Sequence, residues 1–152
     1  MTERTLIIVK PDGVQRHYVG EIISRFEKKG FKLVAAKLMQ ITPEIARKHY
    51  AVHEGKPFFE GVVKYLSSSP AMAMVWEADG VIDMSRKMMG ATFGLTAEPG
   101  TIRGDFSCSK GYNLIHGSDS PESANFEIPI YFAPEEITGY ELSDEEWLYG
   151  SN

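Results

Sequence analysis

Short apolar runs divide the first eighty residues into candidate strands. Residues 5–9 (TLIIV), 31–39 and 71–76 are apolar and β-rich, so they predict three strands. The run at 5–9 has no polar alternation, which is typical of a central strand buried on both faces. Residues 10–13 (KPDG) follow it with turn-forming chemistry, so we expect the strand to end there.

Apolar residues at helical spacing lie between these runs. They predict helices over 19–29 and 81–89, each followed by a glycine that can terminate a helix. Thr42 precedes a proline, which is the signature of a helix start. It introduces an insert of two short helices, near 43–50 and 57–66, between the second and third strands.

The pattern weakens after residue 90. Residues 91–118 show little periodicity, and an irregular loop of that length is usually functional. A Ser-Pro pair at 120–121 predicts one more short helix. Residues 127–132 then alternate apolar and polar positions, so we expect a fourth strand, and Pro129 inside it favours an edge position.

The order of these elements predicts the fold class. The elements follow one another as strand, helix, strand, helical insert, strand, helix, long loop and strand. This order corresponds to the α+β, ferredoxin-like βαββαβ plan, which is a four-stranded antiparallel sheet with helices on one face. Residues 133–152 should form a helix-turn tail, with Ser143 and Glu146 as a capping box. We expect one domain spanning residues 1–152.

Composition and charge narrow the class of protein. The 152 residues carry a formal net charge of −5, so the chain has no broad attraction for nucleic acid or anionic membranes. Its one cysteine, Cys108, cannot form an internal disulfide, which excludes a disulfide-stapled secreted domain. No apolar run approaches the roughly 20 residues of a membrane helix. We therefore expect a cytoplasmic protein without a membrane segment.

Residues 113–120 (NLIHGSDS) carry the most informative chemistry. His116 stands directly before a glycine, hydroxyls and a carboxylate, and a helix start follows. A flexible backbone, orienting groups and a helix N-terminus suit a nucleophile that handles an anion. The alternative at this point is a polar turn that happens to hold a histidine.

Several cations accompany the unusual segments. Lys10 ends the first strand, Arg86 lies on the helix at 81–89, and Arg103 lies between two glycines in the long loop. Arginine suits bidentate phosphate binding, although each side chain could instead be solvated or salt-bridged. Neither the Gly-x-x-x-x-Gly-Lys phosphate loop nor the Gly-x-Gly-x-x-Gly dinucleotide motif occurs in the chain.

Two other groups of residues have the composition of a functional site. His49 and His53 stand four residues apart, as zinc ligands on one helical face can, but the sequence shows no third ligand. His116, Ser118 and Asp119 contain the residue types of a hydrolase triad. They lack the Gly-x-Ser-x-Gly elbow that exposes such a serine.

Four separated blocks in order resemble one family. Residues 5–16 (TLIIVKPDGVQR), 57–59 (PFF), 99–106 (PGTIRGDF) and 113–120 (NLIHGSDS) are similar to nucleoside diphosphate kinases, and the last block is highly specific. The similarity runs over nearly the whole chain. It implies an enzyme that moves the γ-phosphoryl group of a nucleoside triphosphate to a different nucleoside diphosphate, by a ping-pong route and with broad base tolerance.

The resemblance also implies roles for single residues. His116 would carry the phosphoryl group, with Ser118, Glu127 and Lys10 supporting catalysis. Phe58 would stack on the base. The residues that would hold the phosphates and the ribose are Lys10, Tyr50, Arg86, Thr92, Arg103 and Asn113.

Cofactor and assembly follow from the same resemblance. We expect Mg²⁺, held mainly by the phosphates of the nucleotide and not by direct protein ligands. We expect nucleoside triphosphates and diphosphates, ATP and GTP among them, as partners. We also expect a homo-oligomer, and the tail at 147–149 favours a hexamer over a tetramer. A nucleotide-binding module without turnover is the alternative, and a metal-dependent hydrolase is a third possibility.

Two departures from the family pattern stand out. Phe93-Gly94 replaces the usual Asn-Pro or Asp-Pro after Thr92, in a loop that shapes subunit contacts in family oligomers. Lys110 lies in a segment more polar than in many relatives and could alter the rim of the nucleotide site.

Overall fold

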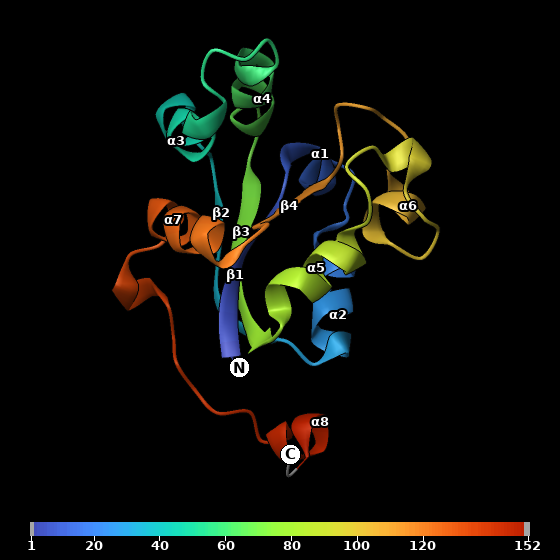
Figure 1. Ribbon diagram of the computed structural model, residues 1–152, viewed down its shortest axis with the longest axis vertical. Helices are drawn as coiled ribbons and strands as arrows, with labels where there is room; N and C mark the ends of the chain where they lie inside the picture. The colour runs from blue at the N-terminus through green and yellow to red at the C-terminus, as the bar shows by residue number, and fades with distance from the viewer. Residues whose placement is uncertain (1, 151–152) are drawn as a thin grey trace.

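A four-stranded antiparallel sheet forms the centre of the computed structural model, which describes residues 2–150 (Figure 1). The strand order is β2-β3-β1-β4, so β1 lies inside the sheet as predicted. β1 pairs with β3 from Thr2↔Asp79 to Val9↔Met72, and β4 pairs with only three residues of β1. The strands are β1 (Thr2–Val9), β2 (Lys32–Met39), β3 (Ala71–Asp79) and β4 (Ile115–Gly117).

Helices cover both faces of this sheet (Figure 1). α2 (Val19–Lys29) and α5 (Val81–Met89) pack on one face, and this part of the molecule confirms the ferredoxin-like βαββαβ plan. The opposite face, which that plan left uncovered, is covered by the helical insert and one later helix. These are α3 (Pro43–His49), α4 (Phe59–Leu66) and α7 (Pro121–Tyr131).

The alternation of side chains along β1 explains the two cores. Ile7 and Val9 belong to the cluster under α2 and α5, whereas Leu6 and Ile8 belong to the cluster under the insert. All four side chains are fully buried. A strand with apolar residues on both faces needs cover on both, which accounts for the continuous run that predicted it.

The helix-end signals in the first half act as the sequence predicted. Gly30 follows α2 in the left-handed conformation with φ 97°, which glycine adopts without steric cost. The Thr42 side chain accepts a hydrogen bond from the Ile45 N–H at 3.2 Å and caps α3. Residues 10–13 do not form a simple turn, because their last three residues begin α1 (Pro11–Gln15).

The predicted strand at 127–132 is wrong. Residues 127–131 belong to α7, which continues through Pro129, and the fourth strand is β4 inside the segment expected to be irregular. Residues 128, 130 and 132 alternate, but Ala124 and Ile128 also have helical spacing, and burial of that face decided the outcome. β4 is three residues long, too short to show a period.

The segment at 91–118 is also more ordered than predicted. Besides β4 it contains α6 (Ile102–Phe106) and the 3₁₀ turn η2 (Gly94–Thr96). A Cβ atom on Gly94 would lie 2.3 Å from the Ser107 Oγ, so this glycine permits a close contact that closes the loop. The departure at Phe93-Gly94 therefore fits the packing within the chain.

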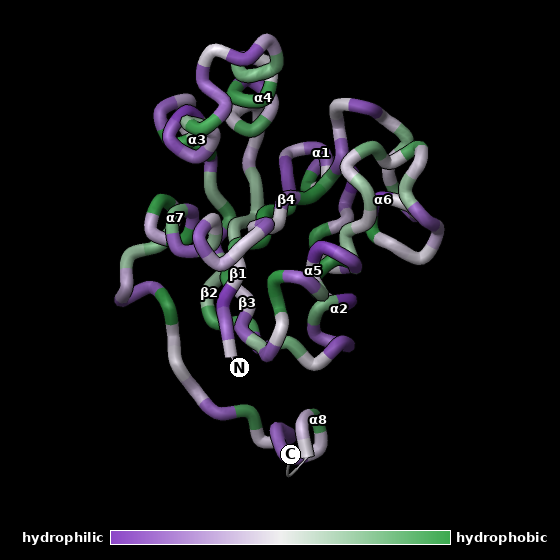
Figure 2. Tube along the Cα trace, in the orientation of Figure 1, coloured by the Kyte–Doolittle hydropathy of each residue, from purple (hydrophilic) through white to green (hydrophobic). Residues whose placement is uncertain are grey.

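The tail runs from α7 along the outside of the molecule and ends in a short helix (Figure 1). The Thr138 N–H donates to the Val34 carbonyl at the edge of β2, and the tail carries both hydrophilic and hydrophobic residues (Figure 2). α8 (Glu145–Tyr149) has Asp144 at its N-cap position without a side-chain cap, so the predicted Ser143–Glu146 capping box does not form. The Leu148 side chain packs on Gly30 instead.

Two remaining 3₁₀ turns are η1 (Ala51–His53) and η3 (Pro134–Glu136). Within residues 2–150, no helix has both the length and the apolar character that crossing a membrane requires.

Candidate active site

The His116 side chain projects from β4 and is held through one of its two ring nitrogens. Nε2 lies 2.9 Å from the Glu127 Oε1. An ionised carboxylate only accepts hydrogen bonds, so Nε2 carries the ring proton and Nδ1 keeps its lone pair. Among residues 2–150 no hydrogen-bond partner is found for Nδ1, which leaves that nitrogen free to act as a nucleophile.

Glu127 is the carboxylate on which this arrangement is built. It projects from α7 and is buried, and its Oε1 also accepts the Ser118 hydroxyl at 2.8 Å. The Ser118 Oγ in turn accepts the Leu6 N–H at 3.2 Å, which ties the group to β1. Burial alone would raise the pKa of Glu127, but interactions with the His116 and His49 rings outweigh it and hold the pKa well below its usual range.

The structure adds His49 to this site. Its ring is buried, Nδ1 lies 2.7 Å from the Tyr131 hydroxyl, and Nε2 lies 3.5 Å from the Glu127 Oε2. The sequence paired His49 with His53, but His53 contacts the Lys56 ammonium instead. Sequence spacing could not bring His49 beside Glu127, because the two residues come from different helices that meet only in the folded chain.

Burial and charge keep His116 neutral. Burial lowers its pKa most, and the neighbouring His49 ring lowers it further, while Glu127 opposes both. The result is a pKa of about 4. Near pH 7 the imidazole is therefore unprotonated at Nδ1, which is the state that a nucleophile needs.

A strained turn sets the position of His116. Leu114 has φ 69°, and the Ile115 N–H donates to the Asn113 carbonyl at 2.8 Å across it, which is the rare γ-turn with positive φ. The Asp12 Oδ2 accepts the Leu114 N–H at 3.1 Å, and the Tyr65 hydroxyl donates to the other Asp12 oxygen. Neither Asp12 nor Tyr65 was predicted as a site residue, and the sequence signal for Asp12 was the turn chemistry after the first strand.

Lys10 and Asn113 form a hydrogen-bonded pair at one side of the site. The Lys10 ammonium donates to the Asn113 Oδ1 at 2.9 Å, and the Asn113 Nδ2 donates to the Thr92 carbonyl at 3.1 Å. Burial and the nearby Arg103 lower the pKa of Lys10 to about 7, against the pull of Asp12. The pair joins the end of β1 to the loop before β4.

Arg103 is at the site, but much of its guanidinium serves the protein itself. It is buried and donates to the carbonyls of Gly90, Asn113 and Ile115 at 3.1, 3.2 and 2.7 Å. Since a guanidinium has five N–H groups, two remain for a ligand. Burial and Arg86 lower its pKa to about 10, so it stays charged near pH 7.

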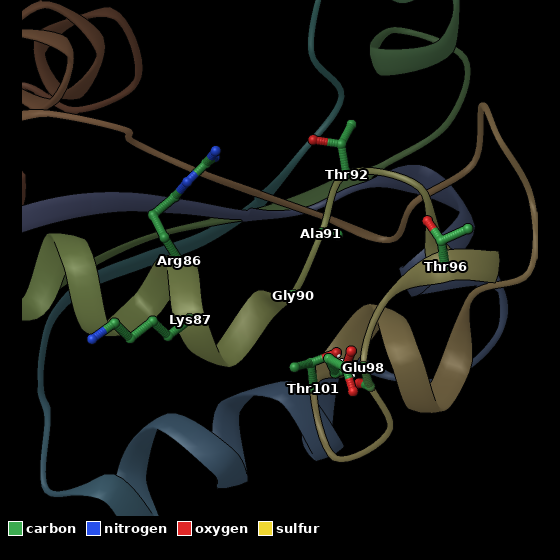
Figure 3. Close-up of a pocket in the computed structure, with 8 residues that line it drawn as sticks. All are labelled: Arg86, Lys87, Gly90, Ala91, Thr92, Thr96, Glu98 and Thr101. Atoms are coloured by element: carbon green, nitrogen blue, oxygen red, sulfur yellow. Dashed lines mark hydrogen bonds between the residues drawn. The ribbon is translucent and has the colours of Figure 1, made fainter.

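Arg86 and Thr92 lie at the edge of a pocket of about 520 Å³ between the end of α5 and the following loop (Figure 3). In this view both side chains extend toward the same side of the chain, whereas Lys87 extends in another direction. The Arg86 guanidinium donates to the Gly117 carbonyl at 3.2 Å, directly after His116. Arg86 is thus brought close to the histidine strand, and Thr92 lies beside Asn113 in the loop before that strand.

The two predicted aromatics occupy different positions. The Tyr50 ring stacks on His49 at 4.4 Å and stands edge-on to His116 at 6.4 Å. Phe58 directly precedes α4, is 50% exposed, and has its ring centroid 5.2 Å from that of His53. The structure therefore brings Tyr50 beside the imidazole, while Phe58 offers an open aromatic face farther out.

Comparisons with known proteins agree on one family. Residues 3–137 match the family model described as nucleoside diphosphate kinase. The chain is 60% identical to the nucleoside diphosphate kinase of Carboxydothermus hydrogenoformans over 147 residues, which cover 97% of this chain and 99% of that protein. It is 57% identical to that of Bacillus cereus, with the same coverage.

Solved structures give the same result. A halophilic nucleoside diphosphate kinase from Halobacterium salinarum in complex with CDP superimposes with a TM-score of 0.95 at 46% identity, covering 98% of this chain and 99% of that one. A transition-state mimic of the Borrelia burgdorferi enzyme with vanadate and ADP gives 0.92 at 39% identity, covering 98% of both chains.

The low pKa of His116 can be measured directly. We expect ring-nitrogen NMR signals of His116 to titrate near pH 4 in the folded protein, because burial opposes protonation. In the unfolded chain the same group should titrate near its ordinary value of about 6.5. As the pH falls from about 6.5 toward 4, only the unfolded chain takes up the proton. The folded state is therefore destabilised relative to the unfolded state over this pH range.

The matched variant is Glu127→Gln. Because Glu127 raises the pKa of His116, its replacement should move the titration to still lower pH. A His116 signal that titrates at or above the ordinary value in the folded protein would contradict this account of the site.

Proposed function

We propose that this chain, which belongs to the nucleoside diphosphate kinase family, carries the phosphoryl group on His116 between two nucleotides. Phosphoryl transfer between nucleotides is the activity of the family. The observation that supports a phosphohistidine is the geometry at β4: a neutral imidazole with Nε2 fixed on Glu127 and Nδ1 free. Near it stand the three cations Lys10, Arg86 and Arg103.

The transfer can be written as two balanced steps. In the first, the His116 Nδ1 lone pair forms a bond to the γ-phosphorus while the bond from that phosphorus to the bridging oxygen breaks. The nucleoside diphosphate leaves with that electron pair. In the second step the terminal oxygen of another diphosphate attacks the phosphorus, and the N–P electrons return to Nδ1. Throughout, the Nε2 proton stays on its hydrogen bond to Glu127, which stabilises positive charge on the ring.

Charge neutralisation by the chain supports the same steps. Lys10 and Arg103 are both buried, and burial together with repulsion from Arg103 lowers the pKa of Lys10. Phosphate oxygens placed between them would relieve that repulsion. Arg86 lies at the more open edge beside Gly117, where a terminal phosphate could approach His116.

The rest of the nucleotide would be held by less specific contacts. We assign the base to the exposed face of Phe58, because stacking is worth roughly 1–3 kcal/mol and tolerates any base. Tyr50, Thr92 and Asn113 would contact the phosphates and the ribose. Two structural relatives, one in complex with CDP and one with bound ADP, agree with such tolerance.

Mg²⁺ fits this site as a cation carried by the nucleotide. The carboxylate at the centre, Glu127, is engaged by His116 and Ser118, and the other groups around the histidine are cationic or neutral. Such a site provides no oxygen cage, so the phosphates would be the ligands. Bound in that way, the ion would neutralise charge on the phosphate oxygens.

A nucleotide-binding module without turnover is the competing reading, and replacing His116 separates the two. We expect wild-type protein mixed with labelled ATP to gain acid-labile phosphate on His116, which a mere binding module would lack. We expect His116→Ala to lose the phosphoenzyme and at least about a thousand-fold in exchange rate, with nucleotide binding retained.

His17→Asn is the matched control for this experiment. His17 is exposed and has φ 67°, a conformation that asparagine tolerates well. This variant should exchange phosphate normally. Normal exchange by His116→Ala would contradict the assignment of the nucleophile, and release of free phosphate without an acceptor would point to a hydrolase.

The low pKa of Lys10 predicts proton uptake when nucleotide binds. With a pKa of about 7, the amine is mostly neutral at about pH 8, and phosphate charge beside it should raise the pKa. We expect uptake of about one proton per ADP at about pH 8, falling toward zero as the pH drops below the pKa. Calorimetry in buffers of different ionisation enthalpy measures it. Lys10→Met should abolish the uptake, and its persistence there would contradict the assignment.

Assembly and location complete the proposal. We propose that the chain forms a homo-hexamer in the cytoplasm. The unpaired Cys108 supports the location. Apolar side chains that the single chain leaves in solvent support the assembly. Phe93, Leu95 and Trp147 are 53%, 71% and 88% exposed. Light scattering should give a mass of about six chains. A mass of four chains or fewer would contradict the hexamer.

A further inference from the structure

We infer that His49, His116 and Glu127 form a binding site for a borderline transition-metal cation such as Zn²⁺, and that the bound ion holds the enzyme inactive. This site is separate in chemistry from the Mg²⁺ carried by a nucleotide. The inhibitory consequence rests on the proposed function, whereas the binding itself does not.

The positions of the donor atoms carry the inference. One ligand atom from each of the three residues lies within 4.8 Å of the other two. The His49 Nε2 is 3.5 Å from the Glu127 Oε2, close to the roughly 3.3 Å between two ligands of a tetrahedral zinc ion with bonds of about 2.0 Å.

His49 provides a second and independent observation. Its ring is 3% exposed, and its Nε2 makes no hydrogen bond although it is buried and aimed at the carboxylate. A buried polar atom left without a partner destabilises the folded chain. A metal ion would give this nitrogen the partner that the described protein atoms do not provide.

The surroundings already contain the outer partners of a metal site. The His49 Nδ1 lies 2.7 Å from the Tyr131 hydroxyl, and the Glu127 Oε1 accepts the Ser118 hydroxyl. Outer partners of this kind orient the ligands of metal sites in proteins. The Tyr131 hydroxyl oxygen can accept a hydrogen bond from the His49 Nδ1–H, and in that tautomer Nε2 has a lone pair for the ion.

The ligand types select the class of cation. Two imidazoles and one carboxylate suit zinc, with a fourth position left for water. Mg²⁺ prefers oxygen ligands in octahedral geometry and would gain little here. The His49–His53 pair suggested by spacing is not the site, because His53 lies against Lys56 and outside the trio.

Metal binding would disable the proposed nucleophile by moving one proton. To ligate through Nε2, the neutral His116 ring must carry its single proton on Nδ1. The nitrogen that would attack phosphorus then has no lone pair, and the hydrogen bond to Glu127 is lost. The ring stays neutral overall, so binding consumes no further reactant, and a chelator should reverse it.

The four histidines of the chain allow a direct binding test on the unmodified protein. Zn²⁺ is added without nucleotide, and the ring signals are followed by NMR. We expect the His49 and His116 signals to shift together at one equivalent, while those of His17 and His53 stay in place. Shifts confined to His17 or His53, or no shift at one equivalent, would overturn the inference.

Variants then test the ligand set. Calorimetry should show Zn²⁺ binding to His49→Asn weakened at least about a hundred-fold, because a metal ligand is lost, and unchanged in His17→Asn. Cys108→Ser serves as the background, so that the exposed thiol cannot contribute. Equal affinity in His49→Asn and His17→Asn would overturn the inference. If His49→Asn does not fold, Tyr131→Phe replaces it, with an expected loss of about ten-fold.

The last measurement distinguishes this inference from the proposed function. Phosphohistidine formation from Mg²⁺-ATP is followed with and without Zn²⁺. We expect Zn²⁺ to suppress it in wild type and His17→Asn, with recovery after EDTA. Without Zn²⁺, absence of phosphohistidine contradicts the proposed function but leaves the NMR result standing. Normal phosphohistidine formation at saturating Zn²⁺ contradicts the inhibitory site alone.

Discussion

The short pairing of β4 with β1 is the constraint on which the site depends. Only three residue pairs hold β4 in the sheet, and one of them sets His116 opposite Ile8. The turn before it is strained, since a backbone with positive φ at a residue such as Leu114 costs of order 1–3 kcal/mol. Asp12 and the Lys10 N–H hold that turn from the other strand end, so the start of the chain fixes a histidine a hundred residues later.

Glu127 gives this position its chemistry. One buried carboxylate faces two imidazoles and a hydroxyl, and its charge determines which nitrogen of His116 carries the proton. The position of the Glu127 carboxylate between the two imidazoles supports both the phosphohistidine and the metal site. In the proposed function the His116 ring attacks with its proton on Nε2. In the inferred metal-bound state the proton would move to Nδ1, and the attacking lone pair would be lost. In the first state the His49 ring, after burial, contributes to the lowered pKa of His116; in the second it becomes a ligand of the ion.

The buried basic side chains near His116 form a site whose charge favours binding of an anion. Lys10 and Arg103 are buried near one another, and the Arg103 guanidinium is held by three carbonyls of the loop and of β4. Burying two like charges is unfavourable in the free protein, as the lowered pKa of Lys10 reflects. Phosphate groups would supply the missing negative charge without any rearrangement of the chain, which is what electrostatic preorganisation requires.

The sequence by itself determined the first three strands, the two helices under one face and the segment that holds the proposed nucleophile. Continuous apolar runs, helical spacing, Gly30 and Thr42 act through neighbours in the chain, so their signals are local. Tertiary structure alone decided that residues 127–131 are helical, that the edge strand is Ile115–Gly117, and that His49 stands beside Glu127. The physical reason is that a three-residue strand has no period, and that contacts between distant helices depend on how their buried faces pack.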